Sequence, residues 1–573
     1  MANTYLNERK TADGFIRLYA VTNSWNSATK KQIKEQVYIG CKRPDGTYNF
    51  NEKTQEYLYL LRGTEYERAY YQWQDCRTYQ RASETTKVDA EVLRYARCTD
   101  LCGGIELLLS HVSETLGLDQ VLEEVFGQCL TDEILTLAYY CASHSRSPLY
   151  AASVWSEGQK LRTEGPLNEG DISRILRDIS ASKVLEFLSL WLRRTPSKNR
   201  LSLDITSVSS YAKNNPDVML GYNRDKEALP QINLLLMVDQ ITKLPVWFEE
   251  LPGAISDMTT VKDTIQLLTQ IDNSPRIIVC DRGFGSMANI KALQQNRFKF
   301  TVGLPLHNFG NVRDLIEEAK ANHEFSVPNI TLDLFEENDA FRTQCVTKLV
   351  KWNDHRVYLH LYYCPSYKYT NENELMQRLD QGEKALKKGK KNEAFRSKFD
   401  QRIAKECFIV KETPKRGLQV KCLPEKVDEL KEECGGYFAI ASNQFKNGSE
   451  ALYVYKLRDG VEKRFDDIKN EEDCRRLRVH SSERMRARLF IQFIAEILRC
   501  YLLERKQTRE TDWKNLKLVP KTVNDIMRAM ASLRYIHIEG HRPFYKRPTK
   551  TQLGLLKFYD IPTTSKTTWP SLN

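Results

Sequence analysis

The sequence of 573 residues lacks several patterns that would assign it quickly to a class of protein. No run of about 18 consecutive apolar residues occurs, so we expect no membrane-spanning helix. The polar first residues lack the apolar core of a secretion signal, so we expect a protein that stays in the cytoplasm. No G-x4-G-K-[ST] motif occurs either, which argues against a phosphate-binding loop and a nucleotide cofactor.

Paired metal-binding cysteines are also missing. The 14 cysteines are scattered along the chain, as expected for reduced thiols in the cytoplasm. Cys98 and Cys102 form a C-x3-C pair, but no second Cys/His pair follows at zinc-finger spacing. We therefore interpret them as small, buried apolar side chains.

The composition is that of a globular protein with several structural units. Hydrophobic residues make up 41% of the chain and charged residues 28%, which provides enough apolar material for a sizeable core. The net charge is +11, and the isoelectric point is near 8.8. A basic balance of this size favours polyanionic partners, of which nucleic acid is the first to consider.

The hydrophobic pattern changes several times along the chain and divides it into six segments. The third and fifth segments are expected to form one α/β core, which the fourth interrupts. The predicted segments are an α+β N-terminal region at 1–97, a mostly helical domain at 98–197, the first part of the core at 198–305, an α+β insertion at 306–435, the second part of the core at 436–505, and a small C-terminal region at 506–573.

The third segment carries the pattern of an α/β sheet, with apolar runs that predict strands and amphipathic stretches that predict helices. The expected elements are strands at 201–205, 231–238 and 244–251, a helix at 259–269, a strand at 276–280, a helix at 287–295 and a strand at 298–302. This is the order of an RNase H-like core, a mixed sheet flanked by helices. The core is expected to resume with a strand at 436–442.

The predicted insertion contains a strand at 357–363 and a long charged helix from about 372 to 405. Between 380 and 405 we count nine Lys or Arg against four Asp or Glu. Such a run forms either a solvated helix face or a DNA-facing one, and the pattern does not choose between them.

Two aspartates stand in unusual places for charged side chains. Asp204 lies inside a predicted apolar strand, and Asp281 directly follows another. A carboxylate there is costly unless it is paired or binds a metal ion. The carboxyl end of a strand is also where α/β sheets usually bind ligands. Taken singly, each residue is also compatible with an ordinary acid at a strand edge.

A third acid, Glu462, lies on a helix predicted from about 449 to 470. Tyr455, Arg458 and Lys469 share its face of the helix, within about 60° around the axis. An apolar stripe beside them can dock the helix on the sheet, and it consists of Val454, Val461, Phe465 and Ile468. One carboxylate among a phenol and two cations suits a site that handles a metal ion and phosphates together.

This helix has the spacing Y-(2)-R-(3)-E-(6)-K and so resembles the signature of a large group of bacterial insertion-sequence transposases. Other blocks are similar to those of the group and occur in the same order, namely 203–206 (LDIT), 221–226 (GYNRDK), 251–257 (LPGAISD) and 281–284 (DRGF). The resemblance covers roughly residues 98–505, and the long insertion before the glutamate is similar as well.

The resemblance implies a DDE active site. Asp204, Asp281 and Glu462 would be its three carboxylates and would hold two divalent ions, Mg2+ with Mn2+ as a substitute. One ion would activate a water or a DNA 3′-hydroxyl, and the other would stabilise the leaving 3′-oxygen. The enzyme would cleave DNA at the ends of its element and then join them to target DNA.

The same resemblance implies that Tyr455, Arg458 and Lys469 bind DNA near the cleaved end. Arg and Lys neutralise phosphates, and Tyr can stack or hydrogen-bond. Some members of the group brace a flipped base with an aromatic residue of the insertion. Trp352 is the candidate for that role, although packing explains a lone Trp more simply.

Some residues of the matching blocks stay outside the predicted catalytic set. Asp257 is interpreted as a helix cap. Asp225 and Lys226 are expected to order a loop near the site. Gly283 and Gly285 suit a tight turn that lets DNA approach closely.

Two other functions remain open. An inactive transposase-derived DNA-binding protein would keep the fold without the chemistry, and a nuclease without strand transfer would use the same residues. The partners expected for the leading hypothesis are the terminal inverted repeats of the element and target DNA. The resemblance further implies a homodimer in a synaptic complex, associated with the nucleoid of a bacterium, with end recognition mainly in residues 1–197.

Overall fold

The computed structural model describes most of the chain. The described residues are 3–27, 29–74, 98–144, 147–194, 200–212, 215–221, 229–254, 257–271, 276–306, 309, 311–325, 343–388, 398–413, 417–433, 435–471, 476–477, 481–538 and 541–562. They form two compact units, one of residues 1–100 and 535–544, the other of residues 101–534 and 545–573. All the candidate site residues belong to the second unit.

The first unit is built on a four-stranded antiparallel sheet. Its strands, in order across the sheet, are β1 (Asn3–Lys10), β2 (Ile16–Asn26), β3 (Lys31–Lys42) and β4 (Tyr48–Phe50), and the 3-10 helix η1 (Glu52–Leu60) follows them. Leu18 and Phe50 pack against Tyr66 and Tyr70 of a helix at 65–74. The α+β character expected of this region is present, and residues 75–97 of the predicted helical stretch lie outside the described part.

The strands and helices of the second unit's sheet follow one another along the chain in the order predicted for its core. Its first elements are β6 (Arg200–Ser210), β7 (Gln231–Asp239), β8 (Pro245–Pro252), α9 (Asp257–Ile271), β9 (Ile277–Cys280), α10 (Met287–Gln295) and β10 (Lys299–Leu304). The order across the sheet is β8-β7-β6-β9-β10. β6, β7 and β8 pair antiparallel, whereas β9 runs parallel to β6 and β10 parallel to β9. This mixed sheet with helices between its strands is compatible with the predicted RNase H-like core.

The segment predicted as an insertion contributes to the same sheet. β15 (Tyr437–Ser442), where a strand was predicted at 436–442, pairs antiparallel with β10. β12 (His355–Tyr363) pairs with the other side of β15, and β11 (Gln344–Trp352) pairs with β12. The sheet therefore continues through two strands of the insertion, which cover the edge that β15 would otherwise expose.

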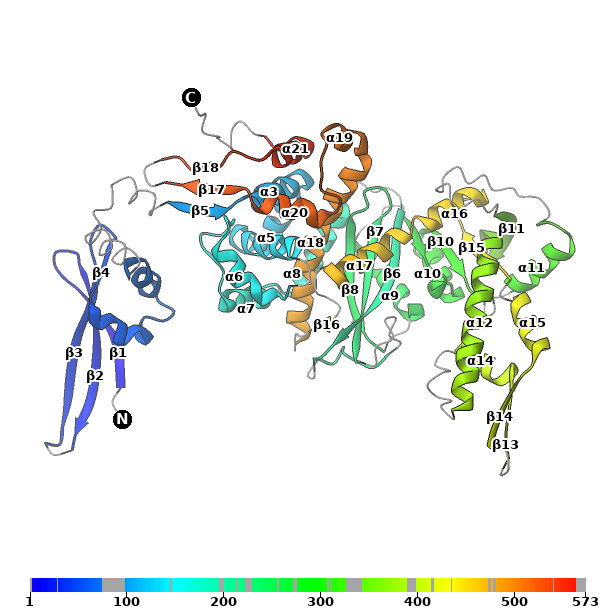
Figure 1. Ribbon diagram of the computed structural model, residues 1–573, viewed down its shortest axis with the longest axis horizontal. Helices are drawn as coiled ribbons and strands as arrows, with labels where there is room; N and C mark the ends of the chain where they lie inside the picture. Colours follow the sequence, from blue (N-terminus) through cyan, green and yellow to red (C-terminus); the bar gives the residue numbers. More distant parts are fainter. Residues whose placement is uncertain are drawn as a thin grey trace. The chain divides into compact units, whose positions relative to one another are not determined.

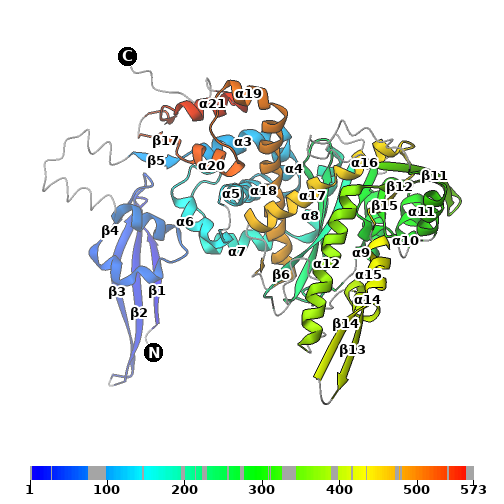
Figure 2. The same ribbon diagram turned by 45° about the vertical axis from the view of Figure 1, so that its right-hand side comes forward.

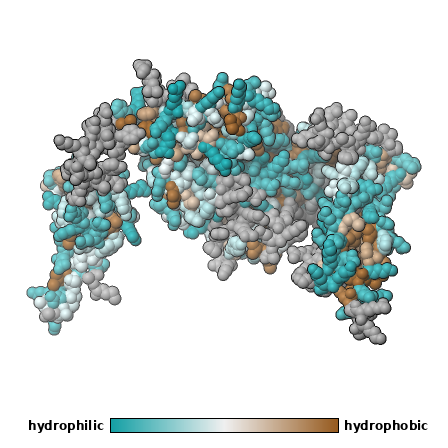
Figure 3. All heavy atoms as spheres, viewed as in Figure 1, coloured by the Kyte–Doolittle hydropathy of each residue, from teal (hydrophilic) through white to brown (hydrophobic). Residues whose placement is uncertain are grey.

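The rest of the insertion forms a small subdomain. Its elements are α12 (Pro365–Lys387), α14 (Lys398–Glu406), β13 (Phe408–Thr413), β14 (Gly417–Cys422) and α15 (Pro424–Glu433). It has a core of its own, made by Leu375, Leu379, Leu386, Ile403, Phe408, Val427 and Leu430. The single charged helix predicted for 372–405 corresponds to α12 and α14, and residues 389–397 between them lie outside the described part. Figure 3 shows a hydrophobic patch over this subdomain, where Ile409 and Val410 of β13 are 40% and 39% exposed.

The region before the core is helical, as predicted. Its helices are α3 (Gly104–Leu116), α4 (Leu118–Phe126), α5 (Gln128–Ser143), η2 (Leu149–Ala151), α6 (Ala152–Glu157), α7 (Glu169–Asp178) and α8 (Ala181–Arg194). A glycine in the left-handed region at Gly117 (φ 67°) ends α3 and starts α4, a conformation that costs a residue with a Cβ more than it costs glycine.

The long helix α18 (Ser482–Thr508) joins this helical region to the sheet (Figures 1 and 2). On one side, the ring of Phe490 lies 5.4 Å from that of Phe126 and 5.1 Å from that of Phe187. On the other side, the ring of Phe493 lies 5.1 Å from that of Phe248 on β8. Because α18 is apolar on both sides, it is buried along most of its length.

The remaining elements are short. They are β5 (Thr99–Cys102), η3 (Arg282–Phe284), α11 (Val312–Ala321), α16 (Gly448–Lys456), α17 (Asp459–Asp466), the π-helical turn η4 (Asp467–Glu471), β16 (Arg476–Leu477), α19 (Glu510–Asn515), α20 (Val523–Ala531), β17 (Arg534–His537), β18 (Phe544–Tyr545) and α21 (Lys550–Phe558). Among the described helices, none combines the length and the hydrophobicity that a bilayer crossing needs.

Cys98 and Cys102 are half-buried rather than buried, and the Cys102 thiol accepts a hydrogen bond of 2.9 Å from Arg534 Nη1.

Candidate active site

Asp204 and Asp281 occupy neighbouring positions on two adjacent parallel strands. β6 and β9 pair with Leu203 opposite Cys280, and each aspartate follows the paired residue of its own strand. Adjacent strands lie about 4.8 Å apart, so the two carboxyl-bearing positions are side by side. The two residues are 77 positions apart in the sequence numbering, and only the parallel register brings them together.

The face of the sheet to which Asp204 points is the one that α18 covers. Asp204 lies opposite Leu236 of β7, which lies opposite Phe248 of β8, and paired residues point to the same side. Phe248 packs on Phe493 of α18. The Asp204 residue is 3% exposed, and its Oδ1 accepts a hydrogen bond of 2.8 Å from the backbone N–H of Ile205.

Arg458 connects the second aspartate to the predicted glutamate. Its Nη1 lies 2.8 Å from Asp281 Oδ1, and its Nη2 lies 3.5 Å from Glu462 Oε1. The Arg458 side chain is 11% exposed, whereas the Glu462 side chain is 57% exposed. Sequence reasoning assigned Arg458 to DNA, but in the structure its guanidinium pairs with two of the three predicted metal ligands.

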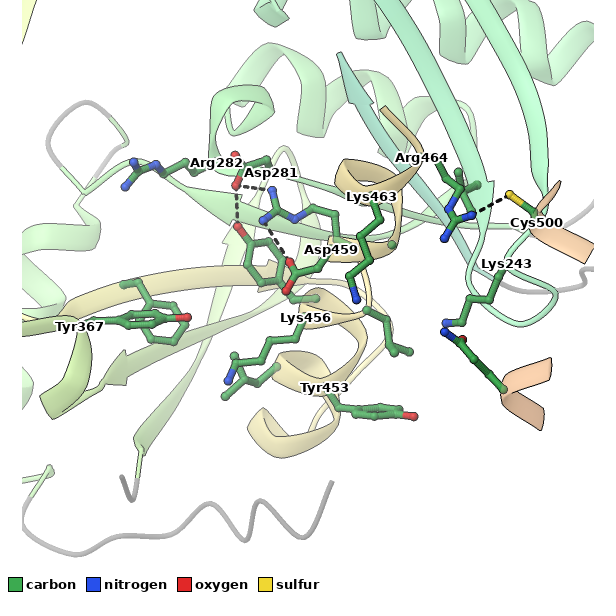
Figure 4. A pocket seen from close by; sticks show the side chains of 18 of the residues that line it. Lys243, Asp281, Arg282, Tyr367, Tyr453, Lys456, Asp459, Lys463, Arg464 and Cys500 are labelled. Atoms are coloured by element: carbon green, nitrogen blue, oxygen red, sulfur yellow. Dashed lines mark hydrogen bonds and ion pairs between the residues drawn. The ribbon is translucent and has the colours of Figure 1, made fainter. Parts of the chain in front are cut away.

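The hydroxyl of Tyr455 also binds Asp281 and donates a hydrogen bond of 2.8 Å to Oδ1 (Figure 4). The tyrosine lies against β10, where a Cβ on Gly303 would come within 2.5 Å of the Tyr455 hydroxyl. Gly303 is a site residue that sequence reasoning missed. The available signal was a glycine inside a buried strand, which often marks the close approach of another group.

The turn after Asp281 is as tight as Gly283 and Gly285 led us to expect. The N–H of Phe284 donates to the carbonyl of Asp281 at 3.0 Å, and the N–H of Gly285 donates to that of Arg282 at 3.0 Å. A Cβ on Gly285 would come within 2.4 Å of the Gly303 carbonyl oxygen. Gly285 therefore permits a close approach of the turn to β10, and the predicted approach of DNA stays a prediction.

The electrostatic surroundings shift the pKa values of two of the acids in opposite directions. Burial alone would raise the pKa of Asp281, but the Arg458 guanidinium, the Tyr455 hydroxyl and the backbone N–H of Arg282 together lower it. Burial raises the pKa of Glu462, and the nearby carboxylates of Asp459, Asp204 and Asp281 raise it further against the opposing effect of Arg458. Because Asp204 and Asp281 both act on Glu462, the three acids share one electrostatic environment.

The helix that carries Glu462 is not the single regular helix predicted for 449–470. α16 ends at Lys456 and α17 begins at Asp459, and the chain between them tightens. The N–H of Arg458 donates to the carbonyl of Tyr455 at 3.2 Å, and the N–H of Val461 donates to that of Arg458 at 2.8 Å. These i to i−3 bonds belong to a 3-10 turn, which advances the following residues around the axis.

The second irregularity is the π-helical turn η4, which contains Lys469. Lys469 is 7% exposed and therefore buried, whereas a regular helix would have placed it beside Glu462. The apolar stripe was predicted correctly, since Val454, Val461, Phe465 and Ile468 are at most 5% exposed. A π turn holds an extra residue, so the faces of the helix after it differ from those of a regular helix.

Trp352 does not join the carboxylates. It ends β11, which is four strands away from β9 and hence roughly 19 Å across the sheet. The register also places it at the opposite end of the strands from Asp281. Its ring packs against Phe309 at 5.1 Å, and its carbonyl accepts a hydrogen bond of 3.4 Å from Gln294.

Three other predicted positions are Asp257, Asp225 and Lys226. α9 begins at Asp257, where a helix cap was expected, but Asp225 and Lys226 lie outside the described residues. The charged subdomain helix α12 contributes Tyr367 to a hollow beside Asp281 (Figure 4).

Three carboxylates and no His or Cys form the donor set that Mg2+ prefers. Within the described ranges, however, no three acidic, imidazole or thiol groups are close enough together to hold an ion. The Arg458 guanidinium lies between Asp281 and Glu462 and neutralises them. The residues fit a divalent ion by their chemistry, provided that Arg458 releases the two acids.

A known protein family matches the part of the chain that contains these residues. A family model described as "Transposase DDE domain" matches residues 195–498, which is more than half of the chain and contains all the site residues named above. The cryo-EM structure of a piggyBac transposase synaptic complex with hairpin DNA is similar to this chain with 13% sequence identity and a TM-score of 0.33, over 74% of this chain and 76% of that one. A search of curated proteins found no match.

Proposed function

The chain belongs to the family of transposase DDE domains, and we propose that it is an active transposase that cleaves DNA at the ends of an insertion sequence and joins them to target DNA. The observation that carries this proposal is the arrangement of Asp204, Asp281 and Glu462 around Arg458 and the end of β9. Asp204 and Asp281 stand side by side at adjacent parallel strands, and Arg458 pairs with both Asp281 and Glu462, which supports the proposal that the three acids act together.

We propose these three acids as the catalytic carboxylates. Two divalent ions, Mg2+ with Mn2+ as a substitute, would bind to them and supply activation of the attacking oxygen and stabilisation of the leaving 3′-oxygen. The pKa of Asp281 is lowered by Arg458 and Tyr455, which keeps this acid ionised and ready to act as a ligand. The pKa of Glu462 is raised, so this acid holds its charge less readily until a cation binds.

Arg458 is proposed to leave Asp281 and Glu462 and to bind a phosphate of the DNA instead. A guanidinium binds phosphate in the same bidentate manner as it binds carboxylate. Cations that neutralised Asp281 and Glu462 would free Arg458 to contact the phosphate next to the reacting bond. Tyr455 would keep Asp281 oriented, and Lys469 would need to leave its buried position to reach DNA.

The finer assignments also rest on the resemblance. The chain is proposed to belong to the Y-(2)-R-(3)-E-(6)-K group, to act as a homodimer in a synaptic complex on terminal inverted repeats, and to work at the nucleoid of a bacterium. End recognition is proposed for residues 1–197, with the helical part contributed by α3 to α8. An inactive DNA-binding descendant and a nuclease without strand transfer are the alternatives that the experiment must separate.

The test is cleavage of supercoiled plasmid that carries the element with its native flanks, in a titration of Mg2+. Wild type is expected to cut at the element boundaries only with metal, and Glu462→Gln is expected to lose cleavage. Glu450→Gln, an exposed glutamate of α16, is the matched control and should cut like wild type. Joined products from pre-cleaved ends distinguish a transposase from a nuclease. DNA binding without cleavage by wild type, in Mg2+ and in Mn2+, would refute the proposal in favour of the inactive descendant.

A further inference from the structure

A hollow of about 910 Å³ opens beside Asp281, and Glu462 is not among the residues that line it (Figure 4). It lies between α16 and α17 on one side, α18 on another, and α12 of the insertion subdomain on a third. We call it the α17 groove. The residues used below from its lining are Lys243, Arg282, Tyr367, Tyr453, Lys463 and Glu504. Asp281 and Arg458 also line it, so the groove reaches the candidate active site directly.

The cations of the groove outnumber its acids by six to three. Arg458 and Arg464 already have acidic partners, Asp281 for the first and Glu496 for the second. Lys243, Arg282 and Lys463 have no acidic group within 4.0 Å in the described part of the chain. An unpaired cation in a recess is an arrangement that favours an anionic ligand.

Lys463 faces the groove because of its place on α17. It directly follows Glu462, so the two side chains leave the helix about 100° apart. Glu462 pairs with Arg458, whereas Lys463 lines the groove (Figure 4). α17 therefore carries a candidate metal ligand and, one residue later, a cation that lines the groove.

Lys243 reaches the same groove from the sheet. It stands in the turn between β7 and β8 in the left-handed conformation, with φ 59°, which a lysine adopts at some cost. Burial lowers its pKa, although Glu504 and Asp239 act in the opposite direction. A lysine that is half-buried without an ion pair gains from a bound anion, because the anion offsets the loss of hydration.

Aromatic side chains alternate with these cations. Tyr453 and Tyr367 line the groove from α16 and α12, and Tyr367 is 44% exposed. Its ring lies 5.5 Å from that of Phe438 on β15, so two aromatic rings stand together at this side of the groove. Lysines interleaved with exposed aromatic rings are the pattern of proteins that bind a single nucleic-acid strand, whose phosphates meet the lysines and whose bases stack on the rings.

We infer that the α17 groove binds one single strand of DNA as it passes Asp281, with Lys463 and Lys243 each neutralising a phosphate. This inference rests on the proposed function, since it names the path of the substrate next to the same site. It assigns a role to residues outside the four-residue signature. It also gives the insertion subdomain a contact with DNA through Tyr367.

The test measures DNA binding in EDTA, so that no turnover is needed. Fluorescence anisotropy follows labelled oligothymidylate, and in a second arm a blunt duplex, over a series of salt concentrations. The variant Lys243→Ala/Lys463→Ala is compared with Lys291→Ala/Lys299→Ala, which removes the same charge from exposed residues of α10 and β10. Equal thermal unfolding temperatures of the two variants exclude a general loss of folding.

For the single strand, the groove variant is expected to reduce the slope of log K against log salt by about 1.4, which is about 0.7 for each lost phosphate contact, and the control is expected to keep the wild-type slope. A groove variant with the wild-type slope would overturn the inference while leaving cleavage, and hence the proposed function, intact. An equal loss on the duplex would overturn the single-strand assignment. Single-strand binding that depends on the two lysines, in a wild type that does not cleave, would support the groove and refute the proposed function.

Discussion

The hydroxyl of Tyr455 donates a 2.8 Å hydrogen bond to a carboxylate oxygen of Asp281, although the two residues are 174 positions apart. The bond links α16 to the end of β9 and therefore joins the two parts of the core across the insertion. The same Asp281 oxygen is paired with Arg458, so that a phenol and a guanidinium fix the orientation of one acid.

Tyr455→Phe is expected to lower the rate of DNA cleavage by about tenfold at neutral pH, because a hydrogen bond to a charged group is lost while the ring stays in place. The Tyr455 hydroxyl lowers the pKa of Asp281, so its removal raises that pKa. The acid limb of the pH–rate profile should therefore move to higher pH. Tyr369→Phe, a tyrosine of α12 that is 70% exposed, is the control. An unshifted acid limb would show that Asp281 does not titrate in the reaction.

Gly303→Ala is expected to reduce cleavage at least as much as Tyr455→Phe does. A Cβ at this position would come within 2.5 Å of the Tyr455 hydroxyl and within 2.9 Å of the backbone nitrogen of Arg282, so either the tyrosine or the turn after Asp281 must move. Gly460→Ala is the matched control, because a Cβ there meets no atom within 4 Å. If both variants cleave at the wild-type rate, the contact between β10 and Tyr455 does not position Asp281.

Arg458→Ala is expected to have opposite effects on metal binding and on cleavage. Removal of the guanidinium frees Asp281 and Glu462, so the half-saturating concentration of Mg2+ should fall. The maximal rate should fall on the order of 100-fold, because the contact to the phosphate is lost. Calorimetric titration with Mg2+ measures the first effect, and plasmid cleavage at saturating metal measures the second. Weaker Mg2+ binding in the variant would show that Arg458 does not compete with the metal.

Glu496→Gln is expected to change how stability depends on pH. Glu496 is fully buried on α18, 3.2 Å from Arg464 of α17, and burial raises its pKa to about 7. A raised carboxyl pKa means that the folded protein binds this proton more tightly, so wild type loses stability as pH rises from about 4.5 to about 7. The variant lacks this loss. The unfolding temperature of the variant minus that of wild type should therefore be several degrees more positive at pH 8 than at pH 5. A difference that is the same at both pH values would contradict the expectation.

Much of the core was predictable because local pattern determines it. The run at 287–295 predicts α10 with its observed bounds, and four strands of the third segment were placed within two residues, whereas β6 extends five residues beyond the predicted 201–205. The apolar stripe of Val454, Val461 and Phe465 also followed from spacing alone, since burial of one helix face requires it. Asp204 and Asp281 were recognisable because a charge in an apolar strand is costly.

The irregular helix was not predictable from periodicity. The spacings of 3, 4 and 7 residues from Tyr455 to Lys469 predict one common helix face only if every turn is regular. In the structure, the chain forms a tighter 3-10 turn at Arg458 and a wider π turn at Lys469. As a result, Arg458 reaches the acids and Lys469 is buried. Trp352 illustrates the same limit in the sheet, because its distance from Asp281 depends on strand order and register, which an apolar run does not encode.

The sequence by itself determined the strands of the core, the apolar stripe of the site helix and the unusual setting of Asp204 and Asp281, because each depends on the chemistry of a few consecutive residues. The tertiary structure alone decided which groups meet: that Asp204 stands beside Asp281, that Arg458 lies between two acids, that Gly303 makes room for Tyr455, and that Lys243 and Lys463 share one groove. These contacts join residues far apart in the chain, and the register of the strands and the packing of α17 on the sheet set their distances.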